Sequence, residues 1–268
     1  MKTVVVSDVH LAVHEAGQPT MERFIAFLRQ LEPSEISRLI ILGDLFDFWF
    51  EYRHVVFSGY FDVLRALADL RDGGVEMHFI CGNHDFWAGR FLREELAFTI
   101  HDGAAHLPFG GRRVMLVHGD GLNPRDWSYR LYKRIARLRI VVGAFRLIHP
   151  DWAMKLAQWV SHGSRKLHAD DLRTGAEIKP LQDFARRALA EGRADVVMCG
   201  HSHHPTFETH PTPEGTGVYI NTGDWLEHES YVEWDGEDFR LLLWGDPPEE
   251  IPCREGGGPE DEASRKPE

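Results

Sequence analysis

The sequence predicts an α/β protein: one main domain, an inserted helical segment and a loose tail. Three observations support this class. Short apolar runs alternate with segments of helical periodicity, which is typical of parallel strands joined by right-handed crossovers. Five of the apolar runs end in a small cluster of Gly, Asp, His or Asn. The chain of 268 residues is also long enough to bury one substantial core.

The first third of the chain alternates regularly between the two kinds of segment. Thr20 is a suitable N-cap for the first helix, and Asp72-Gly73-Gly74 ends the second. The expected strands are 3–6, 39–42 and 77–81, and the expected helices are 20–31, 60–70 and 89–96.

The next part of the chain has shorter and more closely spaced apolar runs. Runs 98–101, 105–109 and 112–117 predict a change to antiparallel strands, with Gly110-Gly111 as a hairpin turn. After these we expect a helix over 176–190, strands over 195–199 and 217–221, and a last hairpin of 231–234 with 239–244.

A helical insertion of about residues 124–173 interrupts the main domain, which we place at 1–245. Apolar residues three or four apart predict one amphipathic helix, and Pro150 with Asp151 starts a second; the two would form a lid. The stripe is Trp127, Leu131, Ile135, Leu138, Val142 and Phe145. Residues 246–268 are rich in Pro, Gly, Glu and Ser, and we expect a disordered tail.

Charge is unevenly distributed along the chain. The net charge is −12, which argues against a nucleic-acid-binding surface, yet residues 125–173 carry eleven Lys or Arg and four Asp or Glu. The three cysteines lack disulfide spacing, and an acid at Asp8 comes too early for a signal peptide. We therefore expect a cytoplasmic protein, and any membrane contact to be peripheral because no apolar run is long enough to span a bilayer.

The five polar clusters predict a metal site. They are Asp8-Val9-His10, Gly43-Asp44, Gly82-Asn83-His84-Asp85, His118-Gly119-Asp120 and Gly200-His201-Ser202-His203-His204. Residues just past the carboxyl ends of strands gather at one edge of an α/β sheet, so the clusters can converge. Their imidazole, carboxylate and amide groups suit Mn, Fe, Co or Zn. Each cluster alone is more often a turn or a surface feature, but five in one chain favour the metal site.

These blocks resemble the signature of the calcineurin-like metallophosphoesterases, in the same order and over residues 8–203. The resemblance implies a two-layer β-sandwich flanked by helices (α/β/β/α) and a dinuclear centre, with manganese as the expected metal. It implies that one metal is held by Asp8, His10, Asp44 and His203. The second would be held by Asp44, Asn83, His118 and His201, so that Asp44 bridges the two.

His84 is not a ligand in the family pattern. The resemblance implies that it is a general acid or a contact to the phosphoryl oxygens, with Asp85 orienting its ring. The alternative is that His84 is a structural histidine packed behind Asn83. Asn83 itself is expected to contact substrate as well as metal.

Within this superfamily the layout resembles the UDP-2,3-diacylglucosamine pyrophosphohydrolases of lipid A biosynthesis. The resemblance rests on segments 43–49 and 111–120 and on a helical cap before Gly-His-Ser-His. It implies release of UMP and 2,3-diacylglucosamine 1-phosphate at the inner face of the inner membrane. Candidate substrate contacts in the cap are Arg125, Asp126, Ser164, Arg165, Lys166 and His168.

One position departs from the well-studied form of that enzyme, which has Arg where this chain has His84. A metallophosphoesterase acting on a nucleotide, a phospholipid or a phosphoprotein therefore stays open, as does a binding scaffold without catalysis. The cap has two interpretations also. Its apolar stripe either packs on the core, or forms a greasy and basic surface for an amphiphilic anionic substrate at a membrane.

Overall fold

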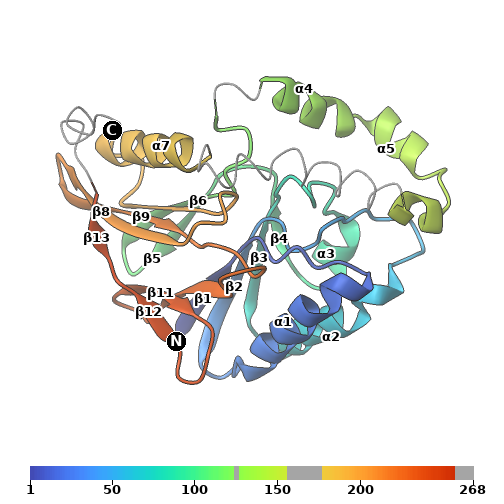
Figure 1. Ribbon diagram of the computed structural model, residues 1–268, viewed down its shortest axis with the longest axis horizontal. Helices are drawn as coiled ribbons and strands as arrows, with labels where there is room; N and C mark the ends of the chain where they lie inside the picture. Colours follow the sequence, from blue (N-terminus) through green and yellow to red (C-terminus); the bar gives the residue numbers. More distant parts are fainter. Residues whose placement is uncertain (124–126, 156–176, 257–268) are drawn as a thin grey trace.

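Two β-sheets lie face to face between outer layers of helices in the computed structural model (Figure 1), which describes residues 1–123, 127–155 and 177–256. Helices α1 (Gln18–Gln30), α2 (Phe61–Asp72) and α3 (Arg90–Glu94) lie on the side of one sheet, and α7 (Ile178–Ala190) covers the other. This four-layer arrangement confirms the predicted fold class.

The first sheet has seven strands. Parallel strands β1 to β4 form one half, and antiparallel strands β10 to β12 extend it beyond β1. In spatial order they are β12 (Glu249–Ile251), β11 (Phe239–Leu243), β10 (Ser230–Trp234), β1 (Lys2–Val6), β2 (Ile36–Leu42), β3 (Glu76–Ile80) and β4 (Thr99–His101).

The second sheet has six strands. Its centre is β6 to β7 to β9, all parallel, and hairpin partners flank it on both sides. In spatial order they are β13 (Arg254–Glu255), β8 (Thr206–Thr212), β9 (Gly215–Asn221), β7 (Val196–Cys199), β6 (Arg112–Val117) and β5 (Ala105–Phe109).

The core follows from the strands being apolar on both faces. In β1, Val4 and Val6 pack towards α1 and α2, whereas Val5 points between the sheets against Ile40 and Ile80. Successive side chains of a strand point to opposite faces, so an unbroken apolar run is what a doubly covered strand requires. A third cluster joins α7 to the outer face of the second sheet.

The cap differs from the single helix expected over the apolar stripe. It contains α4 (Trp127–Ala136), α5 (Arg139–Phe145) and a further helical segment that begins at Pro150. The break has a local cause, because the indole N–H of Trp87 donates to the carbonyl of Ala136 at 3.0 Å. A side chain that takes a carbonyl from the helical hydrogen-bond ladder commonly ends or kinks a helix.

The apolar stripe does not pack on the core at its first four positions. Trp127, Leu131, Ile135 and Leu138 are 67%, 50%, 48% and 51% exposed. Helix α4 instead turns Tyr129, Lys133 and Ala136 towards the main domain. The interpretation of the stripe as core packing is therefore wrong for these residues, whereas Phe145 of α5 does contact Phe50 at 4.6 Å between ring centroids.

Three further expectations are corrected. Strand β4 pairs parallel to β3 rather than antiparallel to β5, which belongs to the other sheet. Strand β8 was missed, although its hairpin with β9 is long. Residues 249–255 were expected to be disordered, but they form β12 and β13. Within the described ranges no helix has the length and apolarity needed to cross a membrane.

Candidate metal centre

The polar clusters follow β1, β2 and β3 of the first sheet and β6 and β7 of the second. Backbone hydrogen bonds join neighbouring clusters within each sheet: His10 N–H donates to the Asp44 carbonyl at 3.0 Å in the first, and Gly200 N–H donates to the His118 carbonyl at 2.9 Å in the second. The N–H of His201 donates to Oδ2 of Asp8 at 2.9 Å and links the two sheets. The strand ends therefore meet at one edge, as the sequence predicts.

The backbone at this edge is strained. Asp8, His10, Asp44, His201 and His203 all have positive φ, between 50° and 68°. Side chains other than glycine seldom adopt this left-handed region, and such strain persists where the surroundings impose it, most often at functional sites.

Two glycines allow the carboxylates to approach the strands closely. A Cβ on Gly82 would overlap the carboxylate of Asp44, and a Cβ on Gly200 would overlap that of Asp8. The Gly-Asn-His and Gly-His-Ser-His patterns thus have a steric basis as well as a chemical one.

Asp44 lies at the centre of the cluster and is fully buried. Its Oδ1 accepts the backbone N–H of His84 at 2.8 Å. Its Oδ2 lies 3.3 Å from Nε2 of His118 and 3.9 Å from Nε2 of His10. One oxygen therefore faces imidazoles from both sheets, the position that a bridging ligand would need.

The surroundings of His118 test whether a cation fits. Its Nδ1 lies 2.9 Å from the carbonyl of Leu42, so Nδ1 carries a proton and donates it. Nε2 then faces two acceptors, Asp44 Oδ2 at 3.3 Å and Asn83 Oδ1 at 3.2 Å. Burial works to lower the pKa of His118, but the charges of Asp44 and Asp8 raise it to about 10. A positive charge between Nε2 of His118 and the oxygens of Asp44 and Asn83 would therefore be stabilised, either as a proton or as a metal cation.

Asp8, His10 and His203 form a second group of possible metal ligands. Nε2 of His203 lies 3.5 Å from Oδ1 of Asp8 and 3.3 Å from Nε2 of His10. Oδ1 of Asp8 is buried without a hydrogen-bond partner, although its Oδ2 accepts the N–H of His201 at 2.9 Å. Burial raises the pKa of Asp8. A buried carboxylate oxygen beside two imidazole nitrogens fits a divalent cation well.

Three groups of three residues have ligand atoms within 4.8 Å of one another in the described part of the chain: Asp8, His10 and His203; Asp8, Asp44 and His118; and His10, Asp44 and His84. His201 is in none of these groups, although its ring centroid lies 5.2 Å from that of His118. Burial, and then the nearby His118 charge, lower the pKa of His201 to about 3, so its ring is neutral, as a metal ligand must be.

His84 lies at the rim of the cluster with its ring fixed from behind. Its Nδ1 donates to the backbone carbonyl of Asp47 at 2.8 Å, and the Asp47 carboxylate is 3.6 Å away. The ring meets that of His10 edge-on, with centroids 4.8 Å apart. A ring nitrogen of His84 also lies within 4.8 Å of ligand atoms of His10 and Asp44.

Asp85 does not orient His84, and that expectation is wrong. Its two oxygens accept the backbone N–H groups of Gly82 at 2.9 Å and Leu45 at 2.8 Å. Burial, and then the charge of Asp44, raise its pKa to about 7. Asp85 ties the loop after β3 to the loop after β2, while Asp47 contacts the imidazole. The sequence signal for Asp47 is its place in Gly-Asp-Leu-Phe-Asp, three residues after Asp44.

The cap reaches the centre through Asp120. This carboxylate accepts the Tyr129 hydroxyl at 2.7 Å and pairs with Lys133, both from α4. Burial works to raise the pKa of Asp120, but His118 and Lys133 hold it below its usual value. Sequence reasoning missed Tyr129 and Lys133, because only the fold brings their helix to the loop after β6.

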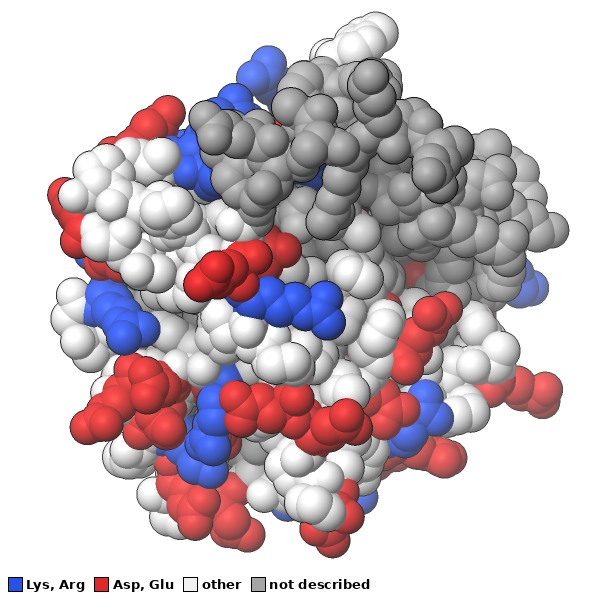
Figure 2. All heavy atoms as spheres, turned by 60° about the vertical axis from the view of Figure 1, so that its left-hand side comes forward, with Lys and Arg blue, Asp and Glu red and all other residues white. Residues whose placement is uncertain are grey.

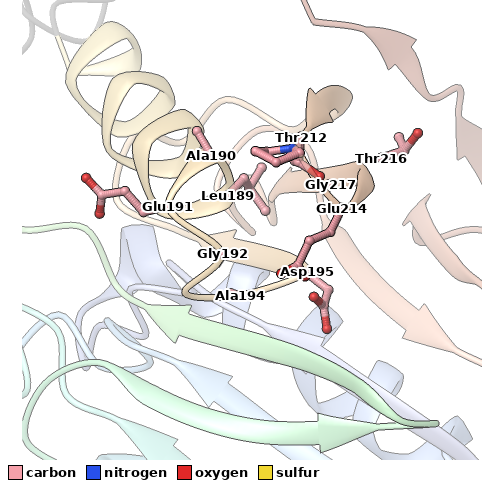
Figure 3. Close-up of a pocket in the computed structure, with 11 residues that line it drawn as sticks. Leu189, Ala190, Glu191, Gly192, Ala194, Asp195, Thr212, Glu214, Thr216 and Gly217 are labelled. Carbon is pink, nitrogen blue, oxygen red and sulfur yellow. The ribbon is translucent and has the colours of Figure 1, made fainter.

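The candidate substrate contacts in the cap, Arg125, Asp126, Ser164, Arg165, Lys166 and His168, lie outside the described residues. A hollow of about 430 Å³ is found elsewhere, between the end of α7 and the β8–β9 turn (Figure 3). It lies next to Asp195 at the amino end of β7, opposite the end that carries His201, and no histidine lines it. It is therefore separate from the metal-ligand cluster.

Comparison with known proteins agrees with this geometry. A family model for calcineurin-like phosphoesterase matches residues 1–205. The UDP-2,3-diacylglucosamine hydrolase of Porphyromonas gingivalis is 32% identical over 250 residues, covering 86% of this chain and 92% of that protein. The enzyme of the same name from Neisseria gonorrhoeae is 29% identical over 252 residues, covering 91% and 97%.

Among solved structures, a single mutant of Vps29 from Entamoeba histolytica aligns over 94% of this chain and 98% of that one, with 14% identity and a TM-score of 0.43. The family assignment depends on the sequence matches and the metal-ligand cluster. On those grounds this chain belongs to the calcineurin-like phosphoesterases and is a hydrolase of that family.

Proposed function

We propose that this protein hydrolyses the pyrophosphate bond of UDP-2,3-diacylglucosamine, giving 2,3-diacylglucosamine 1-phosphate and UMP. The observation that carries the substrate is the 32% identity to a hydrolase of that name along nearly the whole of both chains. The observation that supports the chemistry is the convergence of imidazoles from both sheets on Oδ2 of Asp44.

Two divalent ions, with manganese as the proposed metal, would be held as the family pattern implies. The proposed ligands are Asp8, His10, Asp44 and His203 for one ion, and Asp44, Asn83, His118 and His201 for the other. When bound, such ions neutralise phosphate oxygens and make a nearby water more acidic. Asp44 would contribute one charge to both sites, and the neutral oxygen of Asn83 would limit the negative charge at the second.

The residues of this chain then orient substrate and move a proton. His84, with Nδ1 held by the Asp47 carbonyl, would present Nε2 to the phosphoryl group or to the leaving oxygen. We propose that it acts as a general acid, with the Asp47 carboxylate 3.6 Å from its Nδ1. Asp85 would act indirectly, by keeping the loop that carries Asn83 and His84 in place.

We also propose a peripheral contact with the inner face of the inner membrane, through α4 and α5. Large apolar side chains stand exposed there among Arg130, Arg134 and Arg139, as suits an anionic lipid surface. On the face shown in Figure 2, by contrast, acidic and basic side chains are interspersed over the described surface. The protein would then work in the cytoplasm beside its lipid substrate.

The decisive experiment incubates the Mn-loaded protein with UDP-2,3-diacylglucosamine, with its de-acylated analogue and with a simple aryl phosphodiester. UMP release from the acylated substrate alone supports the proposal. Hydrolysis of the aryl ester without UMP release would indicate the same chemistry on another substrate, which His84 in place of Arg keeps open. If the protein binds less than one equivalent of metal in excess Mn²⁺, the hypothesis of a binding scaffold without catalysis would be favoured instead.

A further inference from the structure

Asp224 contacts one of the proposed metal ligands from behind. It lies in the loop after β9, its side chain is 3% exposed, and its Oδ2 is 3.4 Å from Nδ1 of His203. We propose that Asp224 is a positioning residue that holds His203 with Nε2 turned towards a metal and strengthens that bond. The inference rests on the proposed metal centre and adds to it a residue outside the family's ligand pattern.

The carboxylate is held rigidly. Its Oδ1 accepts three successive backbone N–H groups, from Leu226 at 3.0 Å, Glu227 at 2.8 Å and His228 at 3.1 Å. These bonds anchor Oδ1, which favours the orientation that keeps Oδ2 beside His203. A fixed acceptor of this kind selects one ring orientation in advance of metal binding.

The loop that carries Asp224 is attached to the loop that carries His203. The amide of Asn221 donates to the Gly200 carbonyl at 2.8 Å, and the backbone N–H of Thr222 donates to the Cys199 carbonyl at 2.9 Å. The distance between Asp224 and His203 is therefore set by the pairing of β7 with β9 rather than by two independent loops.

The acceptor behind His203 differs in kind from the one behind His118. Nδ1 of His118 faces the carbonyl of Leu42. Carbonyl oxygens fix a ring without adding charge, whereas a carboxylate also makes the opposite nitrogen a stronger donor to metal. Asp224 should therefore matter to metal affinity and not only to geometry.

Oδ2 of Asp224 is also approached from the outside by His228. Nδ1 of His228 lies 3.3 Å away, and its side chain is 36% exposed. The Asp224 side chain is itself only 3% exposed. This placement keeps the contact between Asp224 and His203 in a poorly solvated environment, where a charge-assisted hydrogen bond is stronger.

The test compares the full-length wild-type protein with Asp224→Asn, in which the amide oxygen can still accept the three backbone N–H groups. Titration calorimetry of the metal-free proteins with Mn²⁺ should show at least one metal equivalent bound ~10–100-fold more weakly in the variant. Asp235→Asn is the matched control. Asp235 Oδ1 also accepts two backbone N–H groups at a turn, but it lies at the exposed β10–β11 hairpin, and its variant should keep wild-type affinity.

A folded Asp224→Asn variant with wild-type Mn²⁺ affinity would overturn the inference, even if its melting temperature were lower. Should that variant not fold, the wild-type protein decides the matter. NMR of the metal-free protein with isotope-labelled histidine should find the proton of the neutral His203 ring on Nδ1, and a neutral ring with its proton on Nε2 would contradict the role. A wild type that binds no metal would instead refute the metal centre itself.

Discussion

The metal-ligand edge and the cap follow opposite physical rules. At the edge, Asp8, Asp44 and His118 are almost fully buried, and much of the backbone is in the left-handed region. In the cap, α4 and α5 are regular helices that expose large apolar side chains. The edge stores strain and unbalanced charge, whereas the cap leaves apolar surface in water. The proposed interactions would relieve both costs: a cation at the edge, and a lipid surface at the cap.

The largest test of this contrast removes the centre of the edge. In Asp44→Asn, the carboxylate shared by the proposed sites becomes neutral while its volume is kept. We expect loss of both metal binding and hydrolysis, because His118 and His10 would no longer face a common anion. Metal analysis and activity should fall together. An active variant with two bound metals would remove Asp44 from the bridging position.

The second test separates chemistry from metal binding within the edge. His84→Ala should keep wild-type metal content and lose ~10²–10⁴-fold in kcat, as expected for removal of a general acid. Asp47→Asn keeps the backbone carbonyl that His84 contacts and should give a smaller loss. Wild-type kcat in His84→Ala would restore the alternative of a structural histidine.

The third test concerns the exposed face of the cap. Replacing Trp127 and Leu131 together by Ala should weaken binding to anionic vesicles by about 2 kcal/mol, or ~30-fold, because less apolar area enters the bilayer. Phe61→Ala is the control, since Phe61 is 63% exposed on α2, outside the cap. Vesicle sedimentation measures all three proteins. Equal binding by the wild type and the double variant would show that this face does not meet lipid.

The smallest expected effect concerns the link between the two regions. Lys133→Met leaves the largely buried Asp120 without its cation, and we expect α4 to open more easily by about 1–2 kcal/mol, less than for a fully buried pair. Hydrogen exchange of α4 amides measures the opening. Lys155→Met, at an exposed lysine of the cap, should leave it unchanged.

The same link should depend on pH. The pKa of Asp120 is held below its usual value in the folded protein. Ionised Asp120 therefore stabilises the folded protein fully above the unfolded pKa of about 4, and this stabilisation is lost as the pH falls through the lower folded pKa. Lys133→Met should lack part of this acid-dependent loss. An identical acid dependence in wild type and variant would show that the ion pair does not hold the cap.

The sequence predicts the edge well and the cap poorly, for a physical reason. Strand ends of parallel sheets share an edge, so Asp8, Asp44 and His118 can be brought together without knowledge of any loop. Which carboxylate meets His84 depends on how two loops fold, and Asp47 rather than Asp85 does so. The end of α4 depends on the indole of Trp87, a residue 49 positions away from Ala136 that no helical pattern can reveal.

The strands closest to the C-terminal end have a consequence for self-association. Strands β12 and β13 occupy one outer edge of each sheet, and they are only three and two residues long. Glu249 and Glu250 on one and Arg254 with Glu255 on the other are exposed. Short, charged outer strands present few free backbone groups to a further strand. At those two borders, the described sheets therefore offer little backbone for pairing with a second copy of the chain.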